Sequence, residues 1–213
     1  MHPLYGDEAL VDRVTRQHLD QGRTIFQLWL AGPTEREHSV TMLDIVRPPH
    51  RARILSLGCG VAGMERWWHT IRPDMTFTLQ NVSKAQLDLC LCPGHRLLGD
   101  AQGYTLPVGV PKHDVTVLAY MLGHVDAQRT LEHAIAATCG TILVLDVMDV
   151  SDAFKRLLHY DPPSPWTMTK LGFRAHRRPK AAWHRVPMGD EDGTDEQRDA
   201  VSHSTPVIWT RHG

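Results

Sequence analysis

From residue 53 onward, the sequence alternates short apolar segments with segments of helical character. The apolar segments are RILSL, TFTLQNV, HRLLGD, HDVTVLAYM and GTILVLDVM, and the helical ones between them include AGMERWWHTI, SKAQLDLCL and AQRTLEHAIAAT. Strands rich in Val, Ile and Leu with little polar alternation are typical of a parallel sheet that is covered on both faces. The alternation therefore predicts an α/β fold with a doubly wound sheet.

Two more segments, KLGFRAHRR and STPVIWTRHG, read as closing strands near the end of the sequence. They follow the Pro-rich DPPSPW, and a long irregular connection is expected between them. Together with the five earlier strands, they predict a mostly parallel, seven-stranded sheet whose last strand returns antiparallel.

The first fifty residues have a different, helical pattern. Asp7 is placed to cap a first helix that stops at Gly22, and Thr34 with Glu37 forms the capping-box pattern at the start of a second. Between these helices lies the apolar TIFQLWLAGP, which could close over a ligand and makes Phe26 and Trp29 candidate pocket residues. We expect residues 1–50 to form a helical lid and residues 51–213 to form the core.

Composition excludes several classes of protein. The chain has 213 residues, enough for one well-buried domain, and a net charge of -1, which gives no basic footprint for nucleic acid. Its polar N-terminus and the absence of a long apolar run argue against a signal peptide or membrane anchor. Cys59, Cys90, Cys92 and Cys139 lack the spacing of disulfide frameworks or zinc ribbons, which predicts reduced thiols, a cytoplasmic protein and no metal site.

Three glycines, Gly58, Gly60 and Gly63, follow the first predicted strand. Their G-x-G-x-x-G spacing is the dinucleotide fingerprint and places a turn at the edge of the sheet where ligands bind. A phosphate would lie on the helix N-terminus and a nucleoside along the strand ends, so the glycines alone do not identify the ligand. A nicotinamide-dependent enzyme typically has an acidic residue at the end of the second strand, which binds the ribose hydroxyls. Gln80 and Asn81 occupy this place here, which weakens the dinucleotide interpretation.

Five segments, taken together in order and spacing, are more specific: ILSLGCGVAG, LQNVSKAQLDL, GDAQGYTLP, HDVTVLAYMLGHV and CGTILVLDV. This set resembles the class I S-adenosylmethionine-dependent methyltransferases, in particular the branch that acts on small molecules and lipids. The resemblance covers residues 53–173 and the final strand. It implies a Rossmann-like methyltransferase fold, S-adenosyl-L-methionine as cofactor, and an N-terminal lid over the methyl acceptor.

The resemblance also implies which residues bind the cofactor. In that family, the glycine turn meets the methionine end, the residues after the second strand meet the ribose, and those after the third strand meet the adenine. Residues after the fourth strand lie near the sulfonium. The candidate cofactor-binding residues are Ser56, Gly58, Cys59, Gly60, Asn81, Val82, Asp100, Ala101 and Ala119.

The sequence departs from the family pattern in the turn and beside it. Ser56 and Asn81 stand where many members carry acidic residues, and both changes remove negative charge from around a cationic ligand. Ala62 replaces a third closely spaced glycine and moves the last glycine to position 63, which a slightly different turn could absorb.

His124 and Tyr120 are the candidate catalytic residues, because both follow the fourth strand at the expected catalytic edge. A histidine titrates near neutral pH and suits the role of general base. A tyrosine could orient an acceptor or place its ring against the sulfonium. The alternatives are structural: His124 could pack against the following helix, and Tyr120 could be a core aromatic residue.

The expected acceptor is a small molecule or a lipid or isoprenoid. Arg13, Arg16 and Arg23, in and directly after the first helix, could bind the phosphates of a prenyl diphosphate, although exposed charges explain them equally well. A nucleic-acid acceptor is not expected, since the nearest base-flipping motif, YDPPSPW, lacks the required aromatic residue and follows the wrong strand. The oligomeric state is not indicated.

Two other functions remain open on the sequence. The first is a catalytically weak or inactive binding protein with the methyltransferase fold, which the missing acidic residues at positions 56 and 81 favour. The second is an NAD-dependent oxidoreductase, which only the literal glycine spacing favours.

Overall fold

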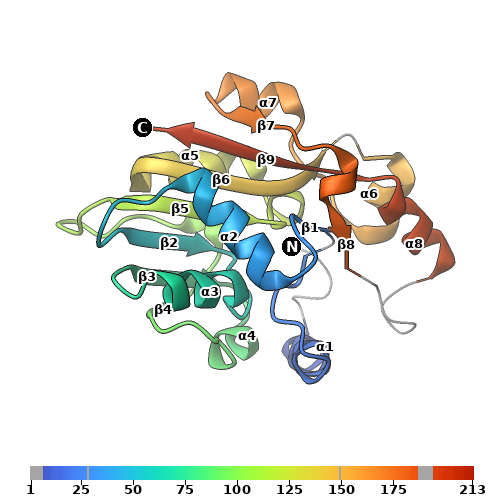
Figure 1. The fold of residues 1–213 in the computed structure, drawn as a ribbon, viewed down its shortest axis with the longest axis horizontal. Coiled ribbons are helices and arrows are strands. Elements are labelled where there is room, and N and C mark those ends of the chain that lie inside the picture. The colour runs from blue at the N-terminus through green and yellow to red at the C-terminus, as the bar shows by residue number, and fades with distance from the viewer. Residues whose placement is uncertain (1–6, 28, 149, 187–193) are drawn as a thin grey trace.

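Seven strands form one sheet in the computed structural model, which describes residues 7–27, 29–148, 150–186 and 194–213. The strands are β2 (Arg53–Leu57), β3 (Thr76–Asn81), β4 (His95–Leu98), β5 (His113–Ala119), β6 (Thr138–Met148), β7 (Arg174–His176) and β9 (Thr205–His212). Their order is β4-β3-β2-β5-β6-β9-β7 (Figure 1). The first five pair in parallel, and β9 is antiparallel to β6 and β7. The predicted α/β fold is confirmed.

Helices cover both faces of the sheet, as the apolar strands require. The helices are α1 (Glu8–Asp20), α2 (Glu35–Val46), α3 (Gly63–Ile71), α4 (Lys84–Asp88), α5 (Ala127–Ala137), α6 (Asp152–Leu158), α7 (Pro165–Lys170) and α8 (Asp195–Ser202). Figure 1 shows α2 in front of the sheet and α5 behind it. A separate two-stranded antiparallel sheet joins β1 (Trp29–Leu30) to β8 (His184–Arg185), and so ties the N-terminal region to the C-terminal one.

Alternate residues of the central strands pack into two different cores. On β2, Ile54 belongs to the core under α2 and α3, whereas Leu55 belongs to the core under α5. On β6, Leu143 and Val144 divide in the same way. Because both faces bury apolar side chains, the strands read as continuous apolar runs in the sequence.

The predicted helix boundaries agree with the structure. The carboxylate of Asp7 accepts from the Leu10 N–H at the start of α1, and Gly22, with a φ of 74°, follows its end. Thr34 caps α2 by accepting from the Glu37 N–H. Each cap satisfies a backbone donor that the first helical turn leaves unpaired.

The connection between the two closing strands is not wholly irregular, so that part of the prediction is wrong. It contains β8 and α8, and α8 begins with a capping box between Thr194 and Gln197. The Pro-rich segment before β7 also contains a helix, α7. Ser164 caps that helix and Pro165 occupies its first position, where the fixed φ of proline suits a helix start.

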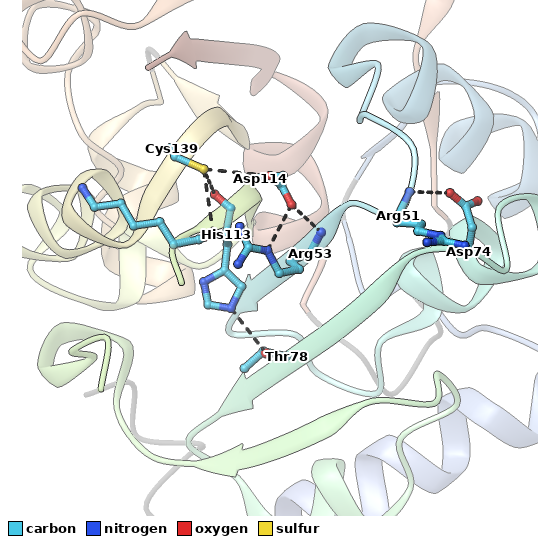
Figure 2. Close-up of polar contacts among 8 residues, drawn as sticks. Arg51, Arg53, Asp74, Thr78, His113, Asp114 and Cys139 are labelled. Carbon is cyan, nitrogen blue, oxygen red and sulfur yellow. Dashed lines mark hydrogen bonds and ion pairs between the residues drawn. The ribbon is translucent and has the colours of Figure 1, made fainter. Parts of the chain in front are cut away.

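A network of polar contacts lies at the amino ends of the parallel strands (Figure 2). Asp114 accepts from the backbone N–H and the Nε–H of Arg53, at 2.8 and 3.3 Å. Burial raises the pKa of Asp114, but the hydrogen bonds from Arg53 outweigh it and leave the pKa lowered. Cys139 donates to the His113 carbonyl at 3.3 Å, and Asp74 accepts from the Arg51 N–H at 2.7 Å. These contacts join strand ends at the edge opposite to the one that parallel α/β sheets use for ligands.

None of the helices within the described ranges is both long and apolar enough to cross a membrane. The four cysteines are free, and no group of three or more His, Cys, Asp or Glu side chains in the described part of the chain could hold a metal ion.

Candidate functional site

A cavity opens at the carboxyl ends of four neighbouring parallel strands, β4, β3, β2 and β5. Ligands bind at this edge in doubly wound sheets. The structure brings all the candidate site residues together around the cavity: Ser56, Gly58, Cys59, Gly60, Asn81, Val82, Asp100, Ala101, Ala119, Tyr120 and His124. Their individual roles in binding and catalysis stay predictions.

The glycine turn after β2 uses the left-handed backbone conformation at alternate positions. Gly58, Gly60 and Ala62 have φ values of 68°, 56° and 55°. The shifted spacing is therefore absorbed by Ala62, which adopts a conformation that costs a residue with a Cβ about 1 to 2 kcal/mol. A Cβ at Gly60 would meet no atom within 4 Å, so the backbone there is open to a ligand.

Gly63 has a different function from the other two glycines. A Cβ at this position would lie 2.1 Å from the carbonyl oxygen of Thr24, so only glycine permits this close approach. Thr24 is itself held by Glu35, whose carboxylate accepts from the backbone N–H groups of Thr24 and Ile25 at 2.7 and 2.8 Å. Gly63 thus docks the N-terminal segment, and the sequence offered no signal for this contact.

That N-terminal segment forms one wall of the cavity. Thr24, Ile25, Phe26 and Gln27 all line it, so the interpretation of Phe26 as a pocket residue is confirmed. The same interpretation is wrong for Trp29, which is buried and donates through Nε1 to Ser204 Oγ at 3.0 Å. Pairing of β1 with β8 turns the tryptophan into the core instead.

Helix α1 supports the same side of the cavity. The carboxylate of Glu8 accepts from Ser83 Oγ and from the Ala85 N–H, both at 3.1 Å, and so joins α1 to the start of α4. Within the cavity wall, Asn81 Nδ2 donates to Gln86 Oε1 at 2.8 Å. This bond fixes the amide of Asn81, the residue expected near a ribose.

Gln80 is a positioning residue that sequence reasoning missed. Its side chain accepts from the Gly58 N–H at 3.4 Å and donates to the Gly99 carbonyl, while its backbone carbonyl accepts from the Cys59 N–H at 3.0 Å. It therefore joins the glycine turn to the loop that carries Asp100. The sequence feature that could have identified Gln80 is its position as a polar residue near the end of β3.

Glu65 is a second residue that the sequence did not identify. It lies in the first turn of α3, lines the cavity and is only 3% exposed. Ser56 Oγ donates to Glu65 Oε1 at 2.6 Å. Burial raises the pKa of Glu65, although the hydrogen bond from Ser56 partly offsets this. Position 56 has no acidic residue, but the carboxylate of Glu65 from α3 lies beside it. Acidic residues are usually exposed to solvent, so the sequence did not indicate this arrangement.

Asp100 and Ala101 follow β4 as expected. Asp100 is exposed, and its Oδ1 accepts from the Gln102 N–H at 2.9 Å, which holds the short helix Ala101–Gly103. Ala101 is buried beside it.

Tyr120 and His124 lie in the loop that follows β5, and Tyr160 packs against this loop. Tyr120 has a φ of 52°, a strained conformation for a tyrosine that costs on the order of 1 to 3 kcal/mol. The ring of His124 packs edge-on against Tyr160, with centroids 4.5 Å apart. Tyr160 donates its hydroxyl to Asp146, which is fully buried at the end of β6. The sequence did not predict this pair.

The charged groups around the cavity are acidic. Glu65 and Asp100 line it, whereas no Lys or Arg of the described residues does. Arg16, one of the arginines considered for a diphosphate, instead pairs with Asp12 at 2.9 Å on the exposed face of α1. A cavity with this charge favours a cationic ligand over an anionic one.

No family model matches the sequence, and the search of curated proteins finds no match. Among solved structures, the [4+2]-cyclase SpnF superposes with a TM-score of 0.70 at 13% identity, over 96% of this chain and 94% of SpnF. A putative sarcosine dimethylglycine methyltransferase from Galdieria sulphuraria superposes at 0.67 and 13% identity, over 95% and 97% of the chains.

A third structure is the phosphoethanolamine N-methyltransferase 2 of Haemonchus contortus, in complex with phosphomonomethylethanolamine and S-adenosylhomocysteine. Its TM-score is 0.68 at 12% identity, over 93% of this chain and 56% of that one. Identities this low speak for the fold alone. With the strand order, they show that this chain has the Rossmann-like fold of the class I S-adenosylmethionine-dependent methyltransferases.

Proposed function

We propose that this protein is an S-adenosylmethionine-dependent methyltransferase that acts on a small-molecule or lipid-type acceptor. The observation that carries the proposal is the charge of the cavity at the glycine turn, which has two carboxylates and no Lys or Arg among its described lining residues. S-adenosylmethionine carries a sulfonium and an ammonium cation, and acidic groups stabilise both. The methyltransferase structures with the same fold give the proposal its cofactor class.

The same charges argue against NAD. The pyrophosphate of a dinucleotide binds at a helix N-terminus, where backbone N–H groups and the helix dipole attract anions. In this protein, the first turn of α3 carries the buried carboxylate of Glu65. A carboxylate at that point would repel the pyrophosphate. The glycine spacing, which was the one feature that favoured an NAD-dependent oxidoreductase, therefore no longer favours it.

The residues of the cavity fit the proposed cofactor. The open backbone at Gly60 leaves room for the methionine part, and Asn81 with Val82 lies where a ribose would be held. Asp100 and Ala101 would receive the adenine, and Ala119 would lie near the sulfonium.

Bound there, the cofactor would supply an electrophilic methyl group for in-line displacement. Much of the rate of such a reaction comes from holding the two reacting atoms in line. Tyr120 would orient the acceptor, and His124 would take a proton from it where the acceptor is a hydroxyl or an acidic carbon. Residues 1–50 would act as a lid that excludes water, with 51–213 as the cofactor-binding core.

A second function, that of a protein with this fold but without methyltransferase activity, is favoured by one observation. SpnF has the same fold and is a [4+2]-cyclase, so the fold does not by itself specify methyl transfer. Titration calorimetry with S-adenosylmethionine, S-adenosylhomocysteine and NADH tests the cofactor. Transfer of label from radioactive S-adenosylmethionine to a compound of a cell extract then tests the reaction. Absence of binding to both sulfur compounds would rule out the proposed enzyme.

Asp100→Ala is expected to weaken the binding of S-adenosylhomocysteine by about 1 to 3 kcal/mol, the scale of removing one partner of a polar group that binding buries. The measurement is the Kd by calorimetry. Asp126→Ala is the matched control, because Asp126 also caps a helix but does not line the cavity. Equal Kd values for the Asp100 variant and the wild type would place the adenine elsewhere.

His124→Ala is expected to lower the rate of methyl transfer about 100-fold or more, the usual contribution of a general base. The affinity for S-adenosylhomocysteine should stay within about twofold, since the histidine would contact the acceptor side of the cavity. Substitution of His95, an exposed residue of β4, serves as the control. Full transfer activity in the His124 variant would assign that side chain to packing against Tyr160.

A further inference from the structure

Glu65 is a carboxylate that the cavity wall buries without a cation. Its side chain is 3% exposed, and no ion pair joins it to a Lys, Arg or His in the part of the chain that the structure describes. The one side chain that donates to it there is the neutral hydroxyl of Ser56. A buried charge of this kind is costly unless a partner of opposite charge compensates for it.

The position of Glu65 limits what that partner can be. Glu65 stands three residues beyond Ala62, which ends the glycine turn, and it is close enough to Cys59 to raise the pKa of that thiol, behind the larger effect of burial. Ser56 Oγ occupies one carboxylate oxygen, Oε1, at 2.6 Å. A cationic group of a ligand that lies against the turn would compensate for the charge of this carboxylate.

We propose that Glu65 is the ammonium-binding residue of the cavity and pairs with the amino group of the ligand's amino-acid part. The inference rests on the proposed function, because it takes the ligand to be an adenosyl amino acid. Ser56 orients the carboxylate, and the pair together replaces an acidic residue at the end of β2. Glu65 is thus a specificity residue that selects ligands with the amino-acid part over plain nucleosides.

Comparing the binding of two ligands distinguishes the contact with Glu65 from the other contacts in the cavity. S-adenosylhomocysteine carries the ammonium group, whereas methylthioadenosine has the same adenosine and sulfur without the amino-acid part. Glu65→Gln should raise the Kd for S-adenosylhomocysteine about 10- to 100-fold, the range for a hydrogen bond to a charged group. The Kd for methylthioadenosine should change by less than about twofold, because the adenosine contacts are intact.

A sharper test of the role of Glu65 is to transfer its carboxylate from α3 to position 56 on β2. Glu65→Gln combined with Ser56→Asp should recover most of the lost affinity for S-adenosylhomocysteine, because the double variant places an acidic side chain at the other end of the same hydrogen bond. A merely structural role of Glu65 would not be restored in this way. The control is Glu132→Gln, which neutralises an exposed acid on α5 and should leave both affinities unchanged.

A measurement on the wild-type protein covers the case in which these variants do not fold. As the pH is lowered from about 8 to about 5, protonation of Glu65 should weaken the binding of S-adenosylhomocysteine relative to methylthioadenosine. The ratio of the two Kd values removes the effects of groups that contact only the adenosine part.

Three results would overturn the inference. They are an unchanged Kd for S-adenosylhomocysteine in Glu65→Gln, an equal loss of affinity for both ligands, and a Kd ratio that does not depend on pH. Failure of the wild-type protein to bind either ligand is a separate result, which would overturn the proposed function and the inference together.

Discussion

Replacing Gly63 with alanine is expected to detach residues 24–27 from the glycine turn and to lower the free energy of unfolding by about 3 kcal/mol, the upper end for overpacking. The added Cβ would lie 2.1 Å from the carbonyl oxygen and 2.5 Å from the carbonyl carbon of Thr24. Backbone atoms cannot rotate away as a side chain does, so either Thr24 or α3 must move. Since residues 24–27 form one wall of the cavity, the affinity for S-adenosylhomocysteine should also fall at least about tenfold.

Urea unfolding and calorimetry measure the two effects. Gly103→Ala is the matched control, because a Cβ at Gly103 meets no atom within 4 Å and its φ lies outside the left-handed region. That variant should unfold within about 0.5 kcal/mol of the wild type, as is usual for a surface substitution. A Gly63 variant with wild-type stability and affinity would show that the N-terminal segment does not depend on this contact.

The fold could be predicted from the sequence because its main determinant is local in the chain. The central strands β2, β5 and β6 carry apolar side chains on both faces, and this pattern is visible in segments such as RILSL and GTILVLDVM. The helix caps at Asp7 and Thr34 were visible for the same reason, since each cap joins residues three positions apart. Helix α7 was not predicted, although Pro165 occupies its first position, where the fixed φ of proline suits a helix start.

The place of the candidate site was predictable too, because parallel strands end at one edge. Residues that follow β2, β3, β4 and β5 are far apart in the sequence, yet the sheet brings them around one cavity. The buried polar partners were not predictable in this way. Glu65, Gln80 and Tyr160 each bond to a residue between nine and twenty-two positions away, and no local pattern specifies such a pairing.

The contact of Gly63 with Thr24 is the clearest example of this limit. The resemblance assigned Gly58 and Gly60 to the ligand and gave Gly63 no role, and the structure shows that Gly63 contacts the N-terminal segment. A glycine that is needed for close backbone approach and one that is needed for a left-handed φ look alike in a sequence. Only the packing of α3 against residues 24–27 separates the two.

The second large effect concerns Asp146, the buried acid beneath the loop of Tyr120 and His124. Burial raises its pKa to about 7, although hydrogen bonds from the Tyr160 hydroxyl and the Val147 N–H favour the charged form. The folded protein therefore holds a proton on Asp146 between about pH 4 and pH 7, where the unfolded chain has lost it. Stability from this group is present below pH 4 and is lost as the pH rises through 7, by about 1.4 kcal/mol per unit.

Asp146→Asn should remove this dependence, because asparagine resembles the protonated acid and does not titrate. We expect the difference in free energy of unfolding, wild type minus variant, to fall by up to about 4 kcal/mol between pH 4 and pH 7. Urea unfolding at a series of pH values measures it. Comparison with the variant is essential because His38 acts in the opposite direction: burial lowers its pKa to about 3, so its contribution is lost as the pH falls below 6.5. A difference that stays constant with pH would mean that Asp146 is charged in the folded protein, with Tyr160 and the backbone amides compensating for its burial.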